Sequence, residues 1–188
     1  MIRPPSPLRL QLALQALAAG GVIACPTEAV WGLSCDPDSR SAVRRLLALK
    51  GRPVDKGLIL VAASEAQLEF LLAGLSPQQR ATLSATWPGP TTWLVPHNGR
   101  VPAWVHGQHN TVAVRVSAHP AVSALCSIWG GPLVSTSANP AGRHPPRAAY
   151  QVKRYFKDQL DYLLAGAVGP SGRPTEIRDL ASGRTVRL

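Results

Sequence analysis

The feature that most constrains the fold is a continuous apolar segment at residues 57–62, with the sequence GLILVA. A strand with one face in water alternates apolar and polar residues, whereas this segment is apolar throughout and must be covered on both faces. Helix-like patterns precede it at residues 38–50 and follow it after Ser64. A buried strand between helices is typical of an α/β domain, in which helices pack on a central sheet.

The other elements follow from β-branched content, helical spacing and turn residues. We expect a helix from Ser6 to the glycines at 20–21 and further helices at 120–129 and 148–156. Strands are predicted at residues 22–25, 31–35, 91–95, 111–116, 132–137, 162–164, 176–180 and 185–188. The strand-rich middle of the chain favours a twisted mixed sheet over a purely parallel one.

Two further helices are predicted from the spacing of a capping box, in which a serine is followed three residues later by glutamine. Ser64 with Gln67 has this spacing, and so has Ser76 with Gln79. Both helices should end before the Trp-Pro-Gly-Pro segment at residues 87–90.

The length of 188 residues suits one domain spanning residues 1–188. Hydrophobic residues make up 45% and charged residues 16%, which excludes a disordered chain. No apolar run reaches the roughly 18–20 residues of a membrane span. The basic and then apolar N-terminus has the leucine spacing of an amphipathic helix rather than of a secretory signal, so we expect a cytoplasmic protein.

The charge balance is strongly positive, with 20 Lys and Arg against 10 Asp and Glu. Most of the cations are arginines, which form bidentate contacts with phosphates and carboxylates. Such a balance favours a polyanionic partner, either a nucleotide or a nucleic acid. A surface charged simply for solubility would have the same composition.

Several kinds of chemistry are not supported by any pattern in the chain. The three cysteines are too few and too scattered for a disulfide framework or a zinc site, and none has an evident activating neighbour. The five histidines lack metal-ligand spacing, and no Ser-His-Asp arrangement stands out. Any reaction should therefore depend on positioning and charge stabilisation, as in nucleotidyl transfer.

Lys50, Arg52 and Lys56 form the best candidate site, because they lie in the connection between a helix and the buried strand. A phosphate chain needs convergent cations of this kind. The alternative is a helix C-terminus that carries basic residues to complement its dipole.

The segment STSAN at 135–139 leaves a buried strand and places Ser135, Ser137 and Asn139 where they could bind phosphate or ribose. Serine and asparagine also simply favour turns. Arg115, inside the strand TVAVRV, must have a partner, which is either a ligand or an internal salt bridge. The turn around Thr27, in PTEAVWG, would suit a small-molecule pocket or a packed turn.

Six segments together resemble the YrdC/TsaC family of threonylcarbamoyl-AMP synthases. They are PTEAVWGLSCDP, LLALKGRPVDKGLILVA, WPGPTTWLVP, TVAVRVSAHP, PLVSTSANPAG and PTEIRDL, and they occur in family order from about residue 8 to the end. The family's KxR and SxN motifs are represented by residues 50–52 and 137–139. The resemblance implies the short, single-domain bacterial form, with a twisted mixed sheet and a deep basic cleft.

The resemblance also implies roles for individual residues. Thr27 and Arg115 would bind threonine, Arg115 through the carboxylate. The nucleotide would be bound by Lys50, Arg52, Lys56, Thr111, Ser135, Ser137 and Asn139. Lys50 and Arg52 would also be catalytic, by stabilising the departing pyrophosphate. The family more often has Thr and Tyr where this chain has Ala29 and Trp31, and often Ser in place of Thr175.

The implied reaction converts ATP, bicarbonate and L-threonine into threonylcarbamoyl-AMP and pyrophosphate, with Mg²⁺ accompanying ATP. The product would serve N6-threonylcarbamoyladenosine modification of tRNA next to the anticodon, through partner proteins of the TsaD, TsaB and TsaE type and with possible weak binding of tRNA or other RNA. Two alternatives stay open. One is a non-catalytic RNA-binding or ribosome-maturation module, although no RNA-binding signature is evident. The other is a diverged relative that binds nucleotide without forming the adenylate.

Overall fold

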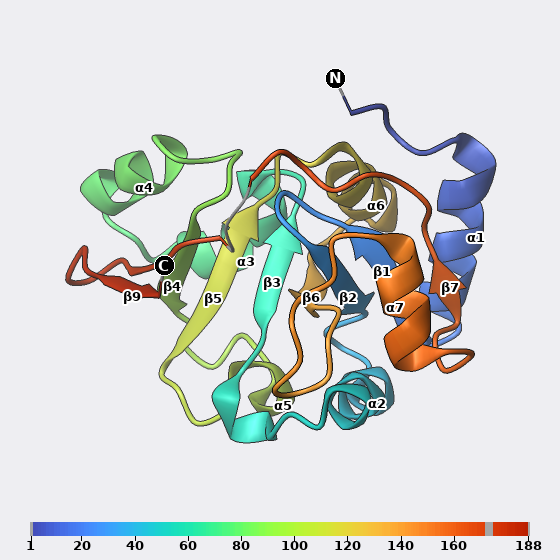
Figure 1. Cartoon of the computed structure of the whole chain (residues 1–188). Coiled ribbons are helices and arrows are strands. Elements are labelled where there is room, and N and C mark those ends of the chain that lie inside the picture. The colour runs from blue at the N-terminus through green and yellow to red at the C-terminus, as the bar shows by residue number, and fades with distance from the viewer. Residues whose placement is uncertain (1, 172–174, 188) are drawn as a thin grey trace.

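A nine-stranded mixed sheet forms the centre of the protein (Figure 1). The computed structural model describes residues 2–171 and 175–187. The strand order is β7-β1-β2-β6-β3-β5-β4-β8-β9, with parallel pairing of β1 with β7, β3 with β5 and β4 with β8. The strands are β1 (Ile23–Pro26), β2 (Trp31–Cys35), β3 (Ile59–Ala62), β4 (Thr92–Pro96), β5 (Thr111–Val116), β6 (Leu133–Ser137), β7 (Tyr162–Leu163), β8 (Ile177–Asp179) and β9 (Thr185–Arg187).

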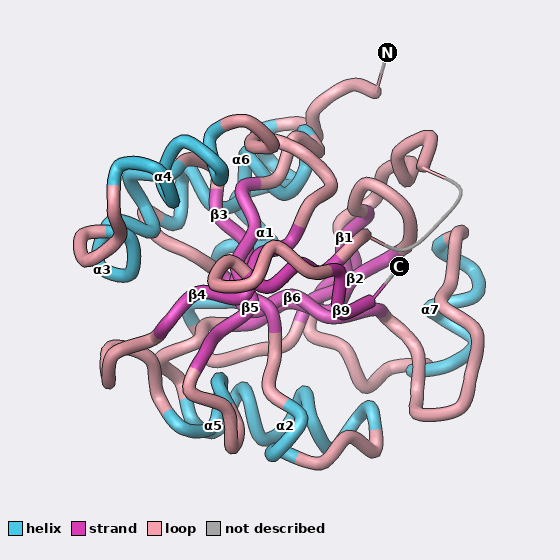
Figure 2. The backbone as a smooth tube through the Cα atoms, turned by 90° about the vertical axis from the view of Figure 1, so that its left-hand side faces the viewer, coloured by secondary structure: helices cyan, strands magenta, loops and turns pink. Residues whose placement is uncertain are grey.

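Helices cover both faces of this sheet, so the prediction of an α/β fold with a mixed sheet is confirmed. Figure 2 shows α3, α4 and α6 on one side of the strands and α2 and α5 on the other. The α-helices are α1 (Pro7–Ala18), α2 (Arg40–Lys50), α3 (Glu69–Leu72), α4 (Pro77–Ser84), α5 (Ala103–His106), α6 (Pro120–Trp129) and α7 (Ala149–Phe156). Within the described ranges, no helix is long and apolar enough to cross a membrane.

Strand β3 lies between β6 and β5 near the middle of the sheet, as its apolar sequence requires. Its side chains alternate between two hydrophobic clusters. Val61 packs in a cluster with α1 and α6, whereas Leu60 and Ala62 belong to the larger cluster that includes the buried side chains of α2. Each face of the strand is therefore buried in a different core.

Only one of the two predicted capping boxes forms. Ser76 accepts a hydrogen bond from the Gln79 backbone, and the Gln79 side chain accepts one from the Ser76 backbone. The prediction for Ser64 was wrong, because the Gln67 side chain accepts a bond from Ala63 N and donates one to Cys126 O in α6. Residues Glu65–Leu68 form a 3₁₀ helix that leads into α3.

Candidate functional site

A pocket of about 390 Å³ opens between the turn that joins β1 to β2, the loop after α2, and strands β5 and β6. It brings together most of the predicted site residues, which come from widely separated parts of the chain. Those in its wall are Thr27, Arg52, Lys56, Thr111, Arg115, Ser135 and Ser137. Among the described residues no carboxylate lines it, whereas Arg52, Lys56 and Arg115 contribute positive charge. Such a pocket suits an anionic ligand.

Arg52 shapes the loop that forms one edge of the pocket. Its Nε and Nη2 donate to Gly57 O at 3.3 and 2.9 Å, and Nη2 also lies 3.3 Å from Lys56 O. Gly57 has φ +61°, and a Cβ at this position would lie 3.0 Å from the His106 carbonyl oxygen. The half-buried guanidinium and the exposed Lys56 are thus held together on a tightly turned backbone.

Lys50 and Asn139 lie behind the pocket wall and do not line it. The Lys50 ammonium, 5% exposed, donates to the carbonyl oxygens of Ser137 and Asn139, the latter at 2.8 Å. Lys50 O in turn accepts from Ala141 N at 2.7 Å. The Asn139 side chain donates to the carbonyls of Pro140 and Arg143. Lys50 therefore joins the two motif loops through their backbone, and burial, assisted by the charge of Arg52, lowers its pKa to about 8.

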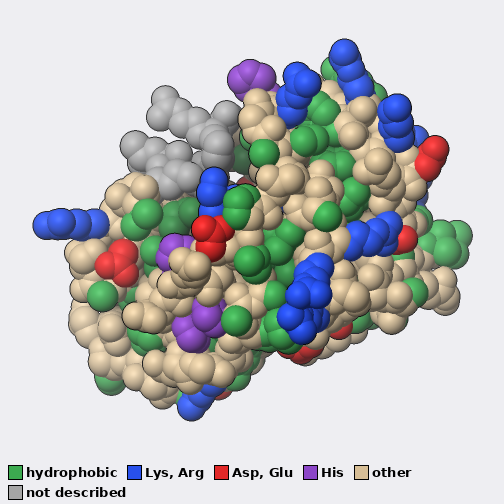
Figure 3. Space-filling model, turned by 90° about the horizontal axis from the view of Figure 1, so that it is seen from below, with side chains coloured by type: hydrophobic (Ala, Val, Ile, Leu, Met, Phe, Trp, Pro, Cys, Tyr) green, Lys and Arg blue, Asp and Glu red, His purple; other side chains and the backbone are tan. Residues whose placement is uncertain are grey.

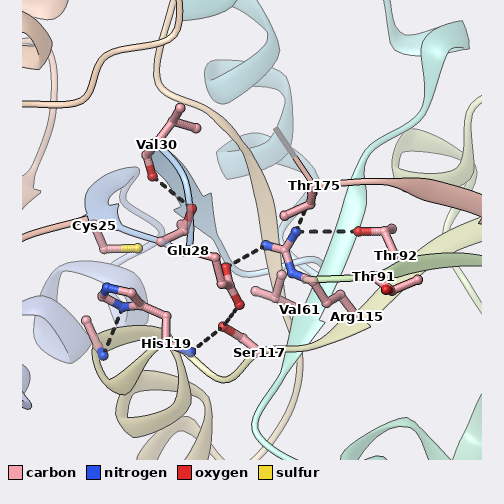
Figure 4. A network of polar contacts seen from close by, with 12 residues as sticks. Cys25, Glu28, Val30, Val61, Thr91, Thr92, Arg115, Ser117, His119 and Thr175 are labelled. Atoms are coloured by element: carbon pink, nitrogen blue, oxygen red, sulfur yellow. Dashed lines mark hydrogen bonds and ion pairs between the residues drawn. The ribbon is translucent and has the colours of Figure 1, made fainter. Parts of the chain in front are cut away.

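Arg115 projects from β5 toward the other end of the pocket, where Figure 4 shows its partners. It is 4% exposed, and its Nη1 donates to Thr175 Oγ1 at 2.8 Å and to Thr92 Oγ1 at 3.4 Å. Its Nη2 lies 3.4 Å from Glu28 Oε2. Of the two partners that the sequence allowed, the internal ion pair is present, and Arg115 also lines the pocket, where the binding of a ligand remains a prediction.

Thr27 lies beside this network, in the turn between β1 and β2. Its Oγ1 donates to Val30 O at 2.8 Å and its N bonds the same carbonyl, so the turn is closed from within. The segment near residue 169 covers the turn, because Gly169 N donates to Thr27 O at 2.8 Å. A Cβ on Gly169 would lie 2.9 Å from Glu28 Cα and closer still to the Glu28 carbonyl oxygen, so the backbones meet only because this residue is glycine.

Ser117, His119 and Glu28 approach one another without forming a nucleophilic triad. Ser117 Oγ donates to Glu28 Oε1 at 2.6 Å, but the histidine contributes only its backbone N to Ser117. The imidazole Nδ1 accepts from Ala121 N, so Nε2 carries the proton that it donates to Ala167 O at 3.1 Å. Burial lowers the pKa of His119 and favours this neutral form. Both ring nitrogens are occupied, so His119 is not available as a base to activate the serine.

The described residues contain no cluster of three or more His, Cys, Asp or Glu side chains that could hold a metal ion. Mg²⁺ is held in proteins by carboxylates together with substrate phosphates, and no described residue that lines the pocket is a carboxylate. An ion that accompanied a nucleotide would be held by the phosphates themselves.

Sequence reasoning included Glu28 in the candidate turn PTEAVWG, but it missed the pairing of Glu28 with Ser117 and the pocket-lining pair His106 and His109. Glu28 and Ser117 are 89 residues apart, and nothing in either segment indicates the pairing. The only signal was their position beside Thr27 and Arg115. Of the positions where the family pattern differs, Ala29 lines the pocket, whereas Trp31 is 1% exposed and packs in the core.

Comparisons with known proteins agree along almost the whole chain. The family model Sua5_yciO_yrdC, described as telomere recombination, matches residues 15–188. The threonylcarbamoyl-AMP synthase of Pseudomonas aeruginosa (strain UCBPP-PA14) is 56% identical over 182 residues, which are 97% of this chain and 98% of that protein. The protein of the same name from Marinobacter nauticus is 54% identical and covers 97% of each chain.

Solved structures of other proteins are similar to this chain over nearly its whole length. Sua5 of P. abyssi, complexed with L-threonine, is similar with a TM-score of 0.87 and 32% identity over 95% of this chain and 53% of its own. YciO of E. coli has a TM-score of 0.84 at 24% identity, over 98% and 91% of the two chains, and shows the likeness of fold alone.

The three cysteines are buried free thiols, as predicted, and should be chemically idle. Burial raises the pKa of Cys25 to about 11 and those of Cys35 and Cys126 to about 12, so almost no thiolate is present near neutral pH. We expect an alkylating reagent to modify these thiols in denaturant but not in the folded protein. Mass spectrometry of both samples checks this, and rapid labelling of a folded thiol would contradict it.

Replacement of Lys50 by Met should change stability in a pH-dependent way. The folded pKa near 8 is below the ordinary 10.5, so between these values the unfolded chain binds more protons and wild-type stability rises with pH. Above about pH 8, the unfolding free energy of the wild type should therefore rise relative to that of Lys50→Met, by at most about 1.4 kcal/mol per pH unit. Urea unfolding at several pH values measures the difference.

The same pH series on Lys153→Met, at an exposed lysine of α7, subtracts the effect of removing one surface ammonium group. A difference for Lys50→Met that stayed constant from pH 7 to 10 would show that this ammonium is solvated.

Proposed function

We propose, because this chain belongs to the Sua5/YciO/YrdC family, that it is a threonylcarbamoyl-AMP synthase. It converts ATP, bicarbonate and L-threonine into threonylcarbamoyl-AMP and pyrophosphate, for N6-threonylcarbamoyladenosine modification of tRNA. The observation that carries the proposal is 56% identity to a threonylcarbamoyl-AMP synthase over 97% of the chain. One pocket collects predicted site residues from four separate segments of the chain, in keeping with this proposal.

The reaction needs the substrates to be held in position, and it does not need a nucleophilic side chain of the protein. Bicarbonate takes up a proton and loses water to give CO₂. The threonine amine adds to CO₂ and releases a proton to give a carbamate, whose oxygen attacks the α-phosphorus of ATP. The bond from the α-phosphorus to the bridging oxygen breaks, and pyrophosphate leaves with the electron pair. The pocket supports this route through its cations and hydroxyls, since no described lining residue is an activated nucleophile.

Arg52 and Lys56 are proposed to bind the triphosphate, with Thr111, Ser135 and Ser137 on the nucleotide side. Arg52 is the proposed catalytic residue, because it lies in the wall where charge develops on the departing pyrophosphate. Lys50 and Asn139 are proposed to act from behind the wall by fixing the Ser137 loop. Mg²⁺ enters as part of the ATP substrate and not as a resident cofactor.

Arg115 and Thr27 are proposed to hold threonine at the buried end. The Arg115 Nε is buried and has no hydrogen-bond partner among the described residues, so the guanidinium keeps a donor available. A carboxylate could accept it together with other guanidinium N–H groups. The P. abyssi Sua5 complexed with L-threonine provides a precedent for threonine binding in this fold.

The product is proposed to pass to partner proteins of the TsaD, TsaB and TsaE type in the cytoplasm. Direct binding of tRNA is a weaker proposal. Figure 3 shows Lys and Arg side chains scattered over the lower face rather than gathered in one patch, which gives an RNA-binding module no particular support.

Pyrophosphate release that requires ATP, threonine and bicarbonate together tests the proposed function. Arg52→Ala should lower this rate by about 100–1000-fold, the usual cost of losing one charge-stabilising contact. Arg154→Ala, which removes an exposed arginine of α7, is the matched control and should retain the wild-type rate. Release that did not depend on threonine, or an active Arg52→Ala protein, would disprove this assignment.

Arg115→Lys should weaken threonine binding and leave ATP binding largely unchanged. Lysine keeps the charge but cannot present the planar pair of N–H donors that a carboxylate accepts. Calorimetric titration of each ligand, with a melting curve, measures the effect. If ATP affinity fell as much as threonine affinity, Arg115 would be a structural residue only.

A further inference from the structure

Glu28 is a buried carboxylate next to the pocket, although it does not line it. Its side chain is 10% exposed, and its two oxygens face different partners. Oε1 accepts a hydrogen bond from the Ser117 hydroxyl, with an oxygen–oxygen distance of 2.6 Å. Oε2 lies 3.4 Å from Arg115 Nη2 and accepts no hydrogen bond in the described part of the chain. A buried carboxylate is costly unless its charge is balanced, and Arg115 is the cation that balances it.

Neighbouring segments hold Glu28 in place, and Figure 4 shows its contact with Ser117. Ser117 donates its N to Ala62 O at 2.9 Å and accepts His119 N at 3.2 Å, so its hydroxyl is aimed at Glu28. On the other side, Gly169 packs directly on the Glu28 backbone. Ser117 therefore orients the carboxylate through Oε1, and the packing of Gly169 fixes the Glu28 backbone, which together keep Oε2 on the side of Arg115.

Without Glu28 the guanidinium would have fewer constraints. Its remaining partners are the hydroxyl oxygens of Thr175 and Thr92, which accept from Nη1 alone. Bonds from one nitrogen leave the guanidinium free to tilt about that end. The charge would also be left uncompensated in a site that is 4% exposed.

We propose that Glu28 is the positioning residue for Arg115, with Ser117 as its anchor, and that it thereby sets the affinity for the amino-acid substrate. The inference rests on the proposed function, in which Arg115 holds the threonine carboxylate. Glu28 acts through Arg115 and does not touch the substrate, since it lies outside the pocket wall.

Glu28→Gln tests this role, because it keeps the shape and the oxygen for Ser117 but removes the charge. We expect the KM for threonine to rise about tenfold or more and the KM for ATP to change by less than about twofold. Ser117→Ala should shift the threonine KM in the same direction by a smaller factor. Glu65→Gln and Ser84→Ala are matched controls, because this carboxylate and hydroxyl form the same contact at 2.8 Å on the surface.

The combination of Glu28→Gln with Arg115→Lys separates positioning from other roles. If Glu28 acts through Arg115, the double variant should have about the threonine KM of Arg115→Lys alone. The proposal would be overturned if Glu28→Gln raised the threonine KM of Arg115→Lys by the same factor as it raises that of the wild type. An unchanged threonine KM in Glu28→Gln alone would also overturn it. A merely structural role would raise both KM values and lower the melting temperature. Failure of the proposed function would instead appear in the wild type, as pyrophosphate release that does not need threonine, and would overturn both.

Discussion

The buried ion pair between Arg115 and Glu28 is the contact on which the arrangement of the pocket depends. It joins β5, near the centre of the sheet, to the turn that follows β1, and each partner would be unfavourable without the other. The partners of the pair extend this constraint outward: Ser117 belongs to the chain after β5, and Thr175 precedes β8. Thr92 of β4 also accepts a hydrogen bond from Arg115, so four segments of the chain meet around one guanidinium group.

A second, independent constraint acts at the opposite side of the site. The ammonium of Lys50 bonds two carbonyl oxygens that lie 87 and 89 residues further along the chain. These bonds explain why a KxR triplet and an SxN triplet belong together: the first supplies the donor that holds the backbone of the second. Two residues of these triplets line the pocket: Arg52, which is two residues after Lys50, and Ser137, whose own carbonyl oxygen accepts one of the two bonds.

Sequence patterns predicted the elements that depend on local preferences. The bounds of β5 and α6 agree with the prediction, because β-branched content and a proline at the first turn are local signals. The Ser64 cap was wrong because Gln67 bonds Cys126 in α6, a contact that no local pattern contains. The pairing of Glu28 with Ser117 was missed for the same reason. The role of Lys50 could not be derived from spacing, since a lysine that faces the pocket and one that faces backbone carbonyls have the same sequence.

The two ends of the pocket differ in how strongly their cationic side chains can attract an anionic group of a ligand. Arg115 is 4% exposed and is held by three side chains, so a carboxylate that reaches it meets oriented donors in surroundings of low dielectric constant. Lys56 is exposed and Arg52 is half-buried, and their attraction for phosphate is reduced by water and salt. A small amino acid has few groups to recognise and needs the rigid, buried end. A triphosphate carries several charges and can be held by weaker contacts that act together, so the proposed placement of the two substrates agrees with the burial of the residues that would bind them.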